Sequence, residues 1–246
     1  IDTIPHNYTF DIDENNPITT YDKYFFYEED NLNLVNTGRR WFGESFGFDF
    51  SQDFETPIES WGADNLLLTI SCAVRSSIPT TFEINNGSLN IATINMPILA
   101  PSSSDYYKSI LFEEQFSYSN NSEISLSFNN NGNNAALAWL DYFTLQGRSN
   151  DFNVNELSHF LFRDSQTVGE GFLTEFQFSR SNDNFNFTIW DVTDPINVKQ
   201  QLLAWDNFHG AFKATTSVLK EFLVFGDPNN AFIPSPIGLV PNQNIH

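Results

Sequence analysis

The chain has 246 residues, of which 40% are hydrophobic and 16% aromatic, including 26 Phe. This composition excludes a disordered chain and suffices for one large or two small domains with a sizeable core. Thirty-one acidic residues against 11 basic ones give a formal net charge of −20, which excludes nucleic acid as a partner because binding to phosphates requires clustered Lys and Arg. The acidity favours solubility, with binding of cations or of a basic partner as the alternative.

Residues 1–43 are predicted to form an N-terminal arm or added strands rather than an independent domain. In the acidic stretch DIDENN, Asp11, Asp13 and Asn15 stand at alternate positions, as ligands do in calcium loops. A helix-flanked calcium loop would also need Gly at its sixth position and Glu at its twelfth, whereas this chain has Asn and Asp there. We therefore expect a solvated acidic arm, with a non-helical calcium site as the alternative.

Residues 44–148 show the two-residue period of β-strands. Ile124, Leu126 and Phe128 alternate with polar residues, as in a half-buried strand. The Asn-Gly pair at 86–87 lies between two such runs and predicts a tight hairpin. Strands are predicted at 44–50, 65–76, 80–86, 89–96, 109–118, 122–128 and 136–146. Their number and spacing favour an antiparallel, jelly-roll-like β-sandwich.

A polar break at 147–151 follows, and residues 149–246 are predicted to form a second, smaller β-sandwich domain. The segment NFNFTIWDV places Phe185, Phe187 and Ile189 at alternate positions, again with the period of a strand. The strands of this domain are expected between HFLFRD at 159–164 and FLVF at 222–225. Helical patterns are sparse throughout, so the predicted fold class is all-β.

Cys72 is the single cysteine, which excludes an internal disulfide framework and a Cys-based zinc site. In the predicted strand LLLTISCAVRSS it shares the apolar face with Ile70 and Val74, where a free cysteine packs as a small hydrophobe. A reactive thiolate needs a helix N-terminus or an adjacent cation, and this segment indicates neither. Cys72 is therefore predicted to be a core residue, and Cys72→Ser is expected to leave folding nearly intact.

Trp139 and Asp141 form the candidate binding site, because an aspartate inside an aromatic strand is costly unless it is paired, at an edge or exposed. Alternation places Trp139, Asp141 and Phe143 on one face, opposite Leu140 and Tyr142. A Trp beside a carboxylate on a sandwich face could stack a sugar ring and bind its hydroxyls. The favoured alternative is that Asp141 caps a neighbouring loop while the aromatic side chains fill the core.

Five segments, in this order, resemble a known family: NTGRRWFGESF at 36–46, CAVRSSIPTTFEINNG at 72–87, AWLDYFTLQGR at 138–148, IWDVTDPINV at 189–198 and VPNQNIH at 240–246. They are similar to the non-catalytic N-terminal region of PorU-type sortases of the type IX secretion system, relatives of the gingipain-type cysteine peptidases. The five segments occur in register, which makes the resemblance specific. The resemblance covers about residues 20–246.

In that family, the terminal NQN(I/L)H is followed by a caspase-like domain that carries the catalytic His and Cys. The resemblance implies that the catalytic domain lies downstream of this chain, and no catalytic residue of the family maps onto it. It implies a chain that is not itself an enzyme and takes no cofactor, exported to the outer-membrane surface of Bacteroidetes. The implied partners are its own downstream peptidase domain, cargo proteins and other secretion components.

Two other functions stay open. The first is a jelly-roll module that binds carbohydrate or lipopolysaccharide, with Trp139 and Asp141 as contacts. A buried Trp139 would count against this function, because a sugar ring stacks only on an exposed aromatic face. The second is a pro-region that inhibits a gingipain-like peptidase until it is cleaved.

Overall fold

The computed structural model describes residues 17–36, 38–56, 61, 65–118, 121–149, 152–155, 159–180, 187–206 and 208–226. These residues form strands and loops with one short 3-10 turn, η1 (Ser165–Thr167), and no α-helix, so the all-β prediction is confirmed. None of the described segments has the helical length and apolarity that a membrane span requires. The chain divides into two compact units: Thr20–Asp151, and Ile1–Thr19 together with Phe152–His246.

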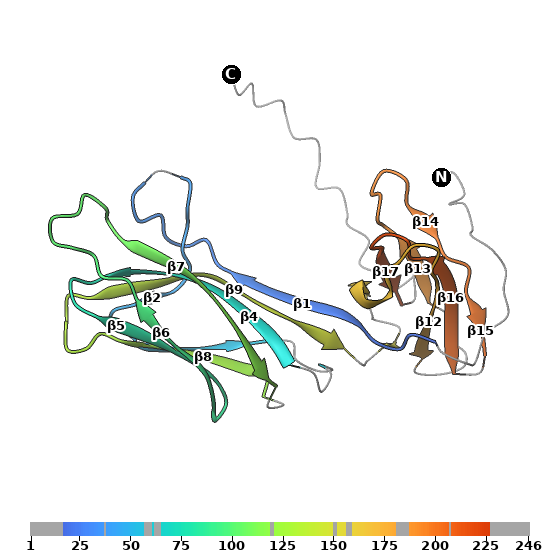
Figure 1. Cartoon of the computed structure of the whole chain (residues 1–246), viewed down its shortest axis with the longest axis horizontal. Coiled ribbons are helices and arrows are strands. Elements are labelled where there is room, and N and C mark those ends of the chain that lie inside the picture. The colour runs from blue at the N-terminus through green and yellow to red at the C-terminus, as the bar shows by residue number, and fades with distance from the viewer. Residues whose placement is uncertain are drawn as a thin grey trace, which may run out of the picture. The chain divides into compact units, whose positions relative to one another are not determined.

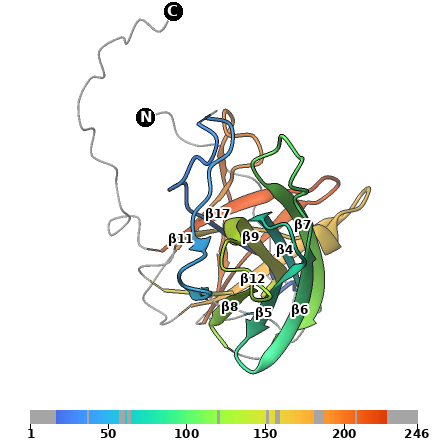
Figure 2. The same cartoon turned by 90° about the vertical axis from the view of Figure 1, so that its left-hand side faces the viewer.

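Two sheets form the first unit (Figure 1). One sheet contains β1 (Tyr21–Glu28), β2 (Ser45–Phe46), β9 (Leu137–Ser149), β4 (Asn65–Arg75) and β7 (Lys108–Ser117). The other contains β3 (Ser51–Glu55), β8 (Glu123–Asn129), β5 (Thr80–Asn86) and β6 (Leu89–Met96). Figure 2, in which this unit faces the viewer, shows β4 and β9 in one layer and β5, β6 and β8 in the other.

Eight of these strands have the neighbour order of a jelly roll, β2-β9-β4-β7 in one sheet and β3-β8-β5-β6 in the other. All of these pairings are antiparallel, as the alternating sequence predicted. The predicted hairpin joins β5 to β6, where Asn86 pairs with Leu89 across Gly87 and Ser88. Gly87 has φ +60°, a conformation that glycine adopts at no steric cost.

The strand predicted at 44–50 is wrong in extent, because β2 ends at Phe46 and β3 begins only at Ser51. Gly47 lies at the break, where a Cβ atom would come within 2.4 Å of the Leu137 side chain. Phe48 follows and is 95% exposed. The chain changes sheets between β2 and β3, and such a corner requires a bend that the two-residue period does not reveal.

The core of the first unit lies between its sheets and mixes aliphatic with aromatic side chains. Strand β4 directs alternate residues into it: the predicted Ile70, Cys72 and Val74, together with Leu66 and Leu68. The facing sheet contributes Phe54, Phe82, Ile84, Ile94, Ile124, Leu126 and Phe128. Period-two alternation therefore identified the buried faces of these strands correctly.

Two groups of four paired strands form the second unit, and the predicted second sandwich is confirmed. One contains β14 (Lys199–Gln200), β13 (Thr188–Asp191), β17 (Glu221–Phe225) and β11 (His159–Arg163). The other contains β10 (Asn153–Val154), β12 (Leu173–Arg180), β16 (His209–Thr215) and β15 (Ala204–Trp205). Strand β10 pairs with β12 in parallel, whereas β11–β17, β12–β16, β13–β17 and the two short edge pairs are antiparallel.

The core of the second unit consists largely of phenylalanine. The central ring is that of Phe162 on β11, which lies against the rings of Phe152, Phe176, Phe178, Phe212 and Phe222. Most of these contacts are edge-on, with ring centroids 5.1–6.5 Å apart, the arrangement that aromatic quadrupoles favour. Because the rings come from β11, β12, β16 and β17, they join the two sheets into one core.

The segment predicted as an N-terminal arm, residues 1–43, contributes to both units. Strand β1 pairs with residues 142–149 of β9 and is an added strand of the first unit. Ile18, by contrast, forms a parallel bridge to Phe176 in the second unit. The compact units therefore begin and end at other residues than the predicted 44–148 and 149–246, because backbone pairing decides which unit a segment joins.

Candidate functional site

Two strands from separate parts of the sequence share one edge of β9. Strand β1 pairs with residues 142–149, and β2 pairs with residues 138–139. Between them, the Gly43 N–H donates to the Leu140 carbonyl, and the Leu140 N–H donates to the Glu44 carbonyl. The segment 29–42, here called the β1–β2 loop, therefore leaves the sheet at the end of β1 and returns beside Leu140.

At the same place, β9 has a β-bulge toward β4. Ser71 pairs with Tyr142, and the next residue, Cys72, pairs with Leu140, so Asp141 is the extra residue. A bulge bends the strand and re-aims its side chains. The Asp141 carboxylate therefore lies on the face of the sheet away from the core, beside Ser71.

The bulge also changes the faces that alternation predicted for AWLDYF. Phe143 is fully buried in the core and not beside Trp139, because one extra residue shifts the alternation. Trp139 is 4% exposed and packs with Phe42 and Ala73, and its ring lies 6.4 Å from those of Phe42 and Tyr106. Trp139 thus has no exposed face on which a sugar could stack.

Arg40, in the β1–β2 loop, is the partner of Asp141. Arg40 Nη2 donates to Asp141 Oδ2 over 2.5 Å, and Arg40 Nε donates to the same oxygen over 3.1 Å. Ser71 Oγ donates to Asp141 Oδ2 and accepts from Arg40 Nη2, both over 2.7 Å. Asp141 is 7% exposed, so a cation and a hydroxyl satisfy a carboxylate that would otherwise be costly to bury.

The electrostatics of the pair stabilise the β1–β2 loop. Burial opposes the charge on Arg40, but the hydrogen bond and the charge of Asp141 outweigh it, and the pKa of Arg40 is raised above its ordinary value. The guanidinium also lies 5.2 Å over the ring of Phe42, which packs on Trp139. The loop is therefore held against β9 by an ion pair and by an aromatic contact.

Three of the segments that carry the family resemblance meet at this point. Segment 36–46 supplies Arg40 and Phe42, segment 72–87 supplies Ala73, and segment 138–148 supplies Trp139 and Asp141. Their shared role in the structure is to fasten a loop to a sheet. The interpretation in which Asp141 holds a neighbouring loop agrees with this geometry. The interpretation of Trp139 as an exposed surface for sugar stacking does not, because Trp139 is buried.

Sequence reasoning did not identify Arg40 or Ser71. The signal available was Asp141 itself, since a carboxylate in an apolar strand requires a partner. Segment 36–46 contains two adjacent arginines, Arg39 and Arg40, but nothing in the sequence places either of them beside β9.

Cys72 is fully buried in the core of the first unit, which confirms that it is a core residue. Burial raises the pKa of its thiol, because a thiolate loses its hydration there. One expectation changes: a serine hydroxyl at this position would be surrounded by apolar side chains. Cys72→Ser is therefore expected to destabilise the fold rather than to be neutral.

In the second unit, the resembling segment 189–198 forms β13 and the turn toward β14. Asp191 is buried; its Oδ1 accepts from the Thr193 N–H over 3.0 Å, and its Oδ2 accepts from Lys220 Nζ over 2.9 Å. Burial by itself would raise the pKa of Asp191, but the hydrogen bonds from Thr193 and Lys220 outweigh it and lower that pKa. This carboxylate ties the turn after β13 to the residue before β17.

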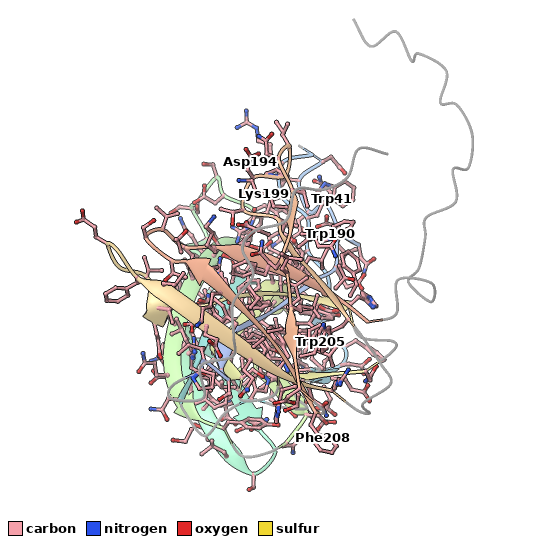
Figure 3. All side chains as sticks on the ribbon, turned by 90° about the vertical axis from the view of Figure 1, so that its right-hand side faces the viewer. Trp41, Trp190, Asp194, Lys199, Trp205 and Phe208 are labelled. Carbon is pink, nitrogen blue, oxygen red and sulfur yellow. The ribbon has the colours of Figure 1, made fainter. Side chains whose placement is uncertain are left out.

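The same turn borders a shallow cavity of about 380 Å³. Asp194 Oδ1 accepts from the Ile196 N–H, and Asp194 Oδ2 accepts from Asn197 Nδ2. Figure 3 shows Asp194 and Lys199 at one end of this unit, with Trp205 and Phe208 toward the other. The carboxylate oxygens of Asp194 serve the turn itself, so this cavity indicates no ligand.

Several predictions lie outside the described residues. These include the possible calcium ligands at 11–16, the closing segment 240–246 and Phe185 in the second domain. Within the described part of the chain, no group of three or more His, Cys, Asp and Glu side chains could hold a metal ion.

Taken together, the first unit is a jelly roll with an ion-paired loop on one face, and the second is a small sandwich with a phenylalanine core. Among solved structures, the chain is similar to dimeric latent PorU from Porphyromonas gingivalis, with a TM-score of 0.74 and 15% identity over 98% of this chain. The chain corresponds to 23% of that protein's length. The agreement shows a PorU-like fold, which is as much as a likeness at this identity shows.

Two viral structures align only weakly with the chain. The structure of infectious bursal disease virus Gx strain aligns with a TM-score of 0.25 and 7% identity, over 91% of this chain and 46% of the viral one. The Gt strain gives 0.23 and 8%, over 91% and 48%. No protein-family model matches the sequence, and no curated protein matches it either.

Proposed function

We propose that this chain is a non-catalytic, β-rich region of a PorU-like sortase at the cell surface, which supports a cysteine peptidase domain and docks cargo or secretion components. The observation that carries the proposal is the PorU-like fold, which spans 98% of this chain and only 23% of the PorU chain. The five segments that resemble the sortase family point in the same direction.

The arrangement of the candidate residues supports a non-catalytic role. Cys72 is inaccessible and its thiol has a raised pKa, the opposite of what an active-site thiolate requires. Asp141, Arg40 and Ser71 hydrogen-bond to one another. Their geometry is that of a structural clamp on the β1–β2 loop.

Binding measurements on the whole 246-residue chain test the proposal. The chain is immobilised and presented with two analytes: a PorU-type peptidase domain, and the C-terminal secretion-signal domain of a cargo protein. We expect saturable binding to at least one of them and no thiol-dependent cleavage of peptide substrates by the chain alone. An acidic protein of similar net charge is the control, because a charge of −20 attracts basic analytes without specificity.

Two results would contradict the proposal: absence of binding to both analytes, or cleavage that thiol reagents abolish. A third result would favour a different role for the chain. If the peptidase domain binds and loses activity in the presence of the chain, the inhibitory pro-region replaces the supporting role.

A further inference from the structure

A cavity of about 510 Å³ opens at one end of the first unit. Its walls come from the end of β4 with the following residues 75–77, from the connection 99–106, and from the turn 133–137 that leads into β9. The volume falls within the range of about 300–1,000 Å³ typical of small-ligand sites. Polar side chains come from each of the three segments, so the cavity suits a hydrophilic ligand.

Arg75 is the cationic group of this cavity. Its guanidinium carbon lies 4.6 Å over the ring of Tyr106, which in turn packs near Trp139. A guanidinium stacked on an aromatic ring keeps its N–H donors in its own plane, where they match the two oxygens of a carboxylate. Tyr106 therefore fixes the orientation of the group without using its donors.

Arg75 differs from two other arginines of the first unit. Arg40 is paired with Asp141, and Arg148 with Asp22. Within the described residues, Arg75 has no ion pair and donates no hydrogen bond, although the chain carries 31 acidic side chains. An oriented, unpaired cation in so acidic a chain suggests that its anion comes from outside.

The rest of the wall supplies groups that recognise hydroxyls. Asn133 Oδ1 accepts from the Ala135 N–H, and Asn133 Nδ2 donates to Ser76 Oγ over 3.3 Å, which positions the amide. The hydroxyls of Ser77 and Ser104 make no hydrogen bond within the described residues. Lys108 and Ser103 lower the pKa of Asp105, so its carboxylate is an acceptor at neutral pH.

We propose that this cavity binds an acidic sugar. Arg75 pairs with the sugar's carboxylate, and the sugar's hydroxyls hydrogen-bond to the side chains of Ser77, Ser104, Asp105 and Asn133. The carboxylate follows from the oriented guanidinium. A sugar fits better than an acidic peptide because the wall offers donors and acceptors rather than an apolar recess for a side chain. This proposal is independent of the PorU-like role and moves the candidate glycan site from Trp139 to its neighbour Tyr106.

Titration of the isotopically labelled 246-residue chain with digalacturonate, followed by NMR, tests the proposal. We expect chemical-shift changes confined to 75–77, 99–106 and 133–137, and no binding of the neutral disaccharide digalactose at the same concentration. Arg75→Gln should weaken binding by about tenfold or more, the cost of a lost charge-assisted pair. Arg75→Lys keeps the charge but loses the bidentate hydrogen bonding of the guanidinium, and it should weaken binding less than Arg75→Gln does.

Arg39→Gln is the matched control, because it removes the same charge from an exposed residue outside the cavity, and its affinity should equal that of the parent chain. The proposal is overturned if Arg75→Gln binds as tightly as the parent, if digalactose competes equally, or if the shifts map elsewhere. Tighter binding of an N-acetylated acidic dipeptide than of digalacturonate would also overturn it in favour of a peptide site. Should Arg75→Gln unfold the chain, Tyr106→Leu provides the second test, with a loss of affinity expected.

Discussion

The two units build a sandwich core from different side chains. In the first, β4 and β9 are 11 and 13 residues long, and they bury mainly Leu, Ile, Val and Ala beside a few aromatic rings. In the second, β11 and β17 have five residues each, and the core is a cluster of phenylalanine rings. Because one aromatic side chain buries about 150–250 Å², a few large rings substitute for strand length.

Buried charges also serve the two units differently. Asp141 lies in the middle of a long strand, at a bulge, and holds a loop that is distant in sequence. Asp191 lies at the end of a short strand and holds the adjacent turn together with Lys220. In the first unit, the buried carboxylate holds a loop that is distant in sequence. In the second, it holds the adjacent turn, and the two sheets are joined by packed phenylalanine rings.

The largest effect is expected from Phe162→Ala in the second unit. Loss of the central ring leaves a cavity among its neighbours and should reduce the free energy of unfolding by about 3–5 kcal/mol. Urea unfolding combined with hydrogen-exchange mass spectrometry would assign the loss to the strands of this unit. Phe208→Ala is the matched control, because Phe208 is 62% exposed and its removal should change stability by about 0.5 kcal/mol or less.

The same experiment tests whether the core of the second unit depends on its phenylalanine rings. A loss below about 1 kcal/mol for Phe162→Ala would mean that the ring cluster is not the main source of stability in the second unit. Exchange that increases only in strands of the first unit would contradict the assignment as well.

Asp141→Ala comes next and tests the long-range clamp of the first unit. The change leaves Arg40 without its partner, and since that side chain is 33% exposed, we expect a loss of about 2–3 kcal/mol rather than the full cost for a buried charge. Trypsin should also cleave after Arg39 or Arg40 faster than in the parent chain. In a double-mutant cycle, Arg40→Ala should add little to Asp141→Ala.

Asp105→Ala is the control for the clamp, because the Asp105–Lys108 pair lies on the surface, with 50% and 42% of the side chains exposed. An exposed pair contributes little, so stability should hardly change. Equal effects of the two substitutions, or additive effects in the cycle, would contradict the role of the Asp141 clamp.

The first unit was largely predictable because its strands are half buried. The predicted strands at 80–86 and 89–96 coincide with β5 and β6, and alternation identified the inward residues of β4. The errors lie at 44–50 and at Phe143, where a bend and a bulge interrupt the period. Neither feature has a signature in the sequence of its own strand, because each depends on the strand or loop that packs against it.

The second unit and the candidate site were less predictable. Strands β10, β14 and β15 have two residues each, too few to show any period. The Asp141 clamp joins residues 101 positions apart in sequence, and a partner at that distance follows only from the fold. The sequence indicates that Asp141 needs a partner, but it does not identify Arg40 as that partner.

A smaller, pH-dependent effect is expected from Asp191→Asn in the second unit. The carboxylate accepts from Lys220 Nζ and from the Thr193 N–H, so we expect a loss of about 1–2 kcal/mol at pH 7. The pKa of Asp191 is lowered in the folded chain, so its contribution is complete above the unfolded value of about 3.9. The contribution disappears as the pH falls through the lowered value.

Urea unfolding of Asp191→Asn and the parent chain between pH 7 and pH 2 measures this dependence. The difference in stability should stay constant down to about pH 4 and then shrink. A difference that grows on acidification, or that does not change with pH, would show that Asp191 acts through packing and not through its charge.

The smallest effect on stability is expected from Cys72→Ala, which tests the mixed core of the first unit. The thiol is fully buried beside aliphatic neighbours, and its removal should cost about 1 kcal/mol, as for a small deletion in a core that can partly relax. In the parent chain, a thiol reagent at pH 8 should label Cys72 only as fast as the first unit opens, because the buried thiol is inaccessible in the folded state. Labelling should therefore accelerate in Asp141→Ala, which weakens the same unit, and stay unchanged in Phe162→Ala, which weakens the other. Rapid labelling of the folded parent chain would show that Cys72 is accessible and that the core of the first unit is looser than its packing indicates.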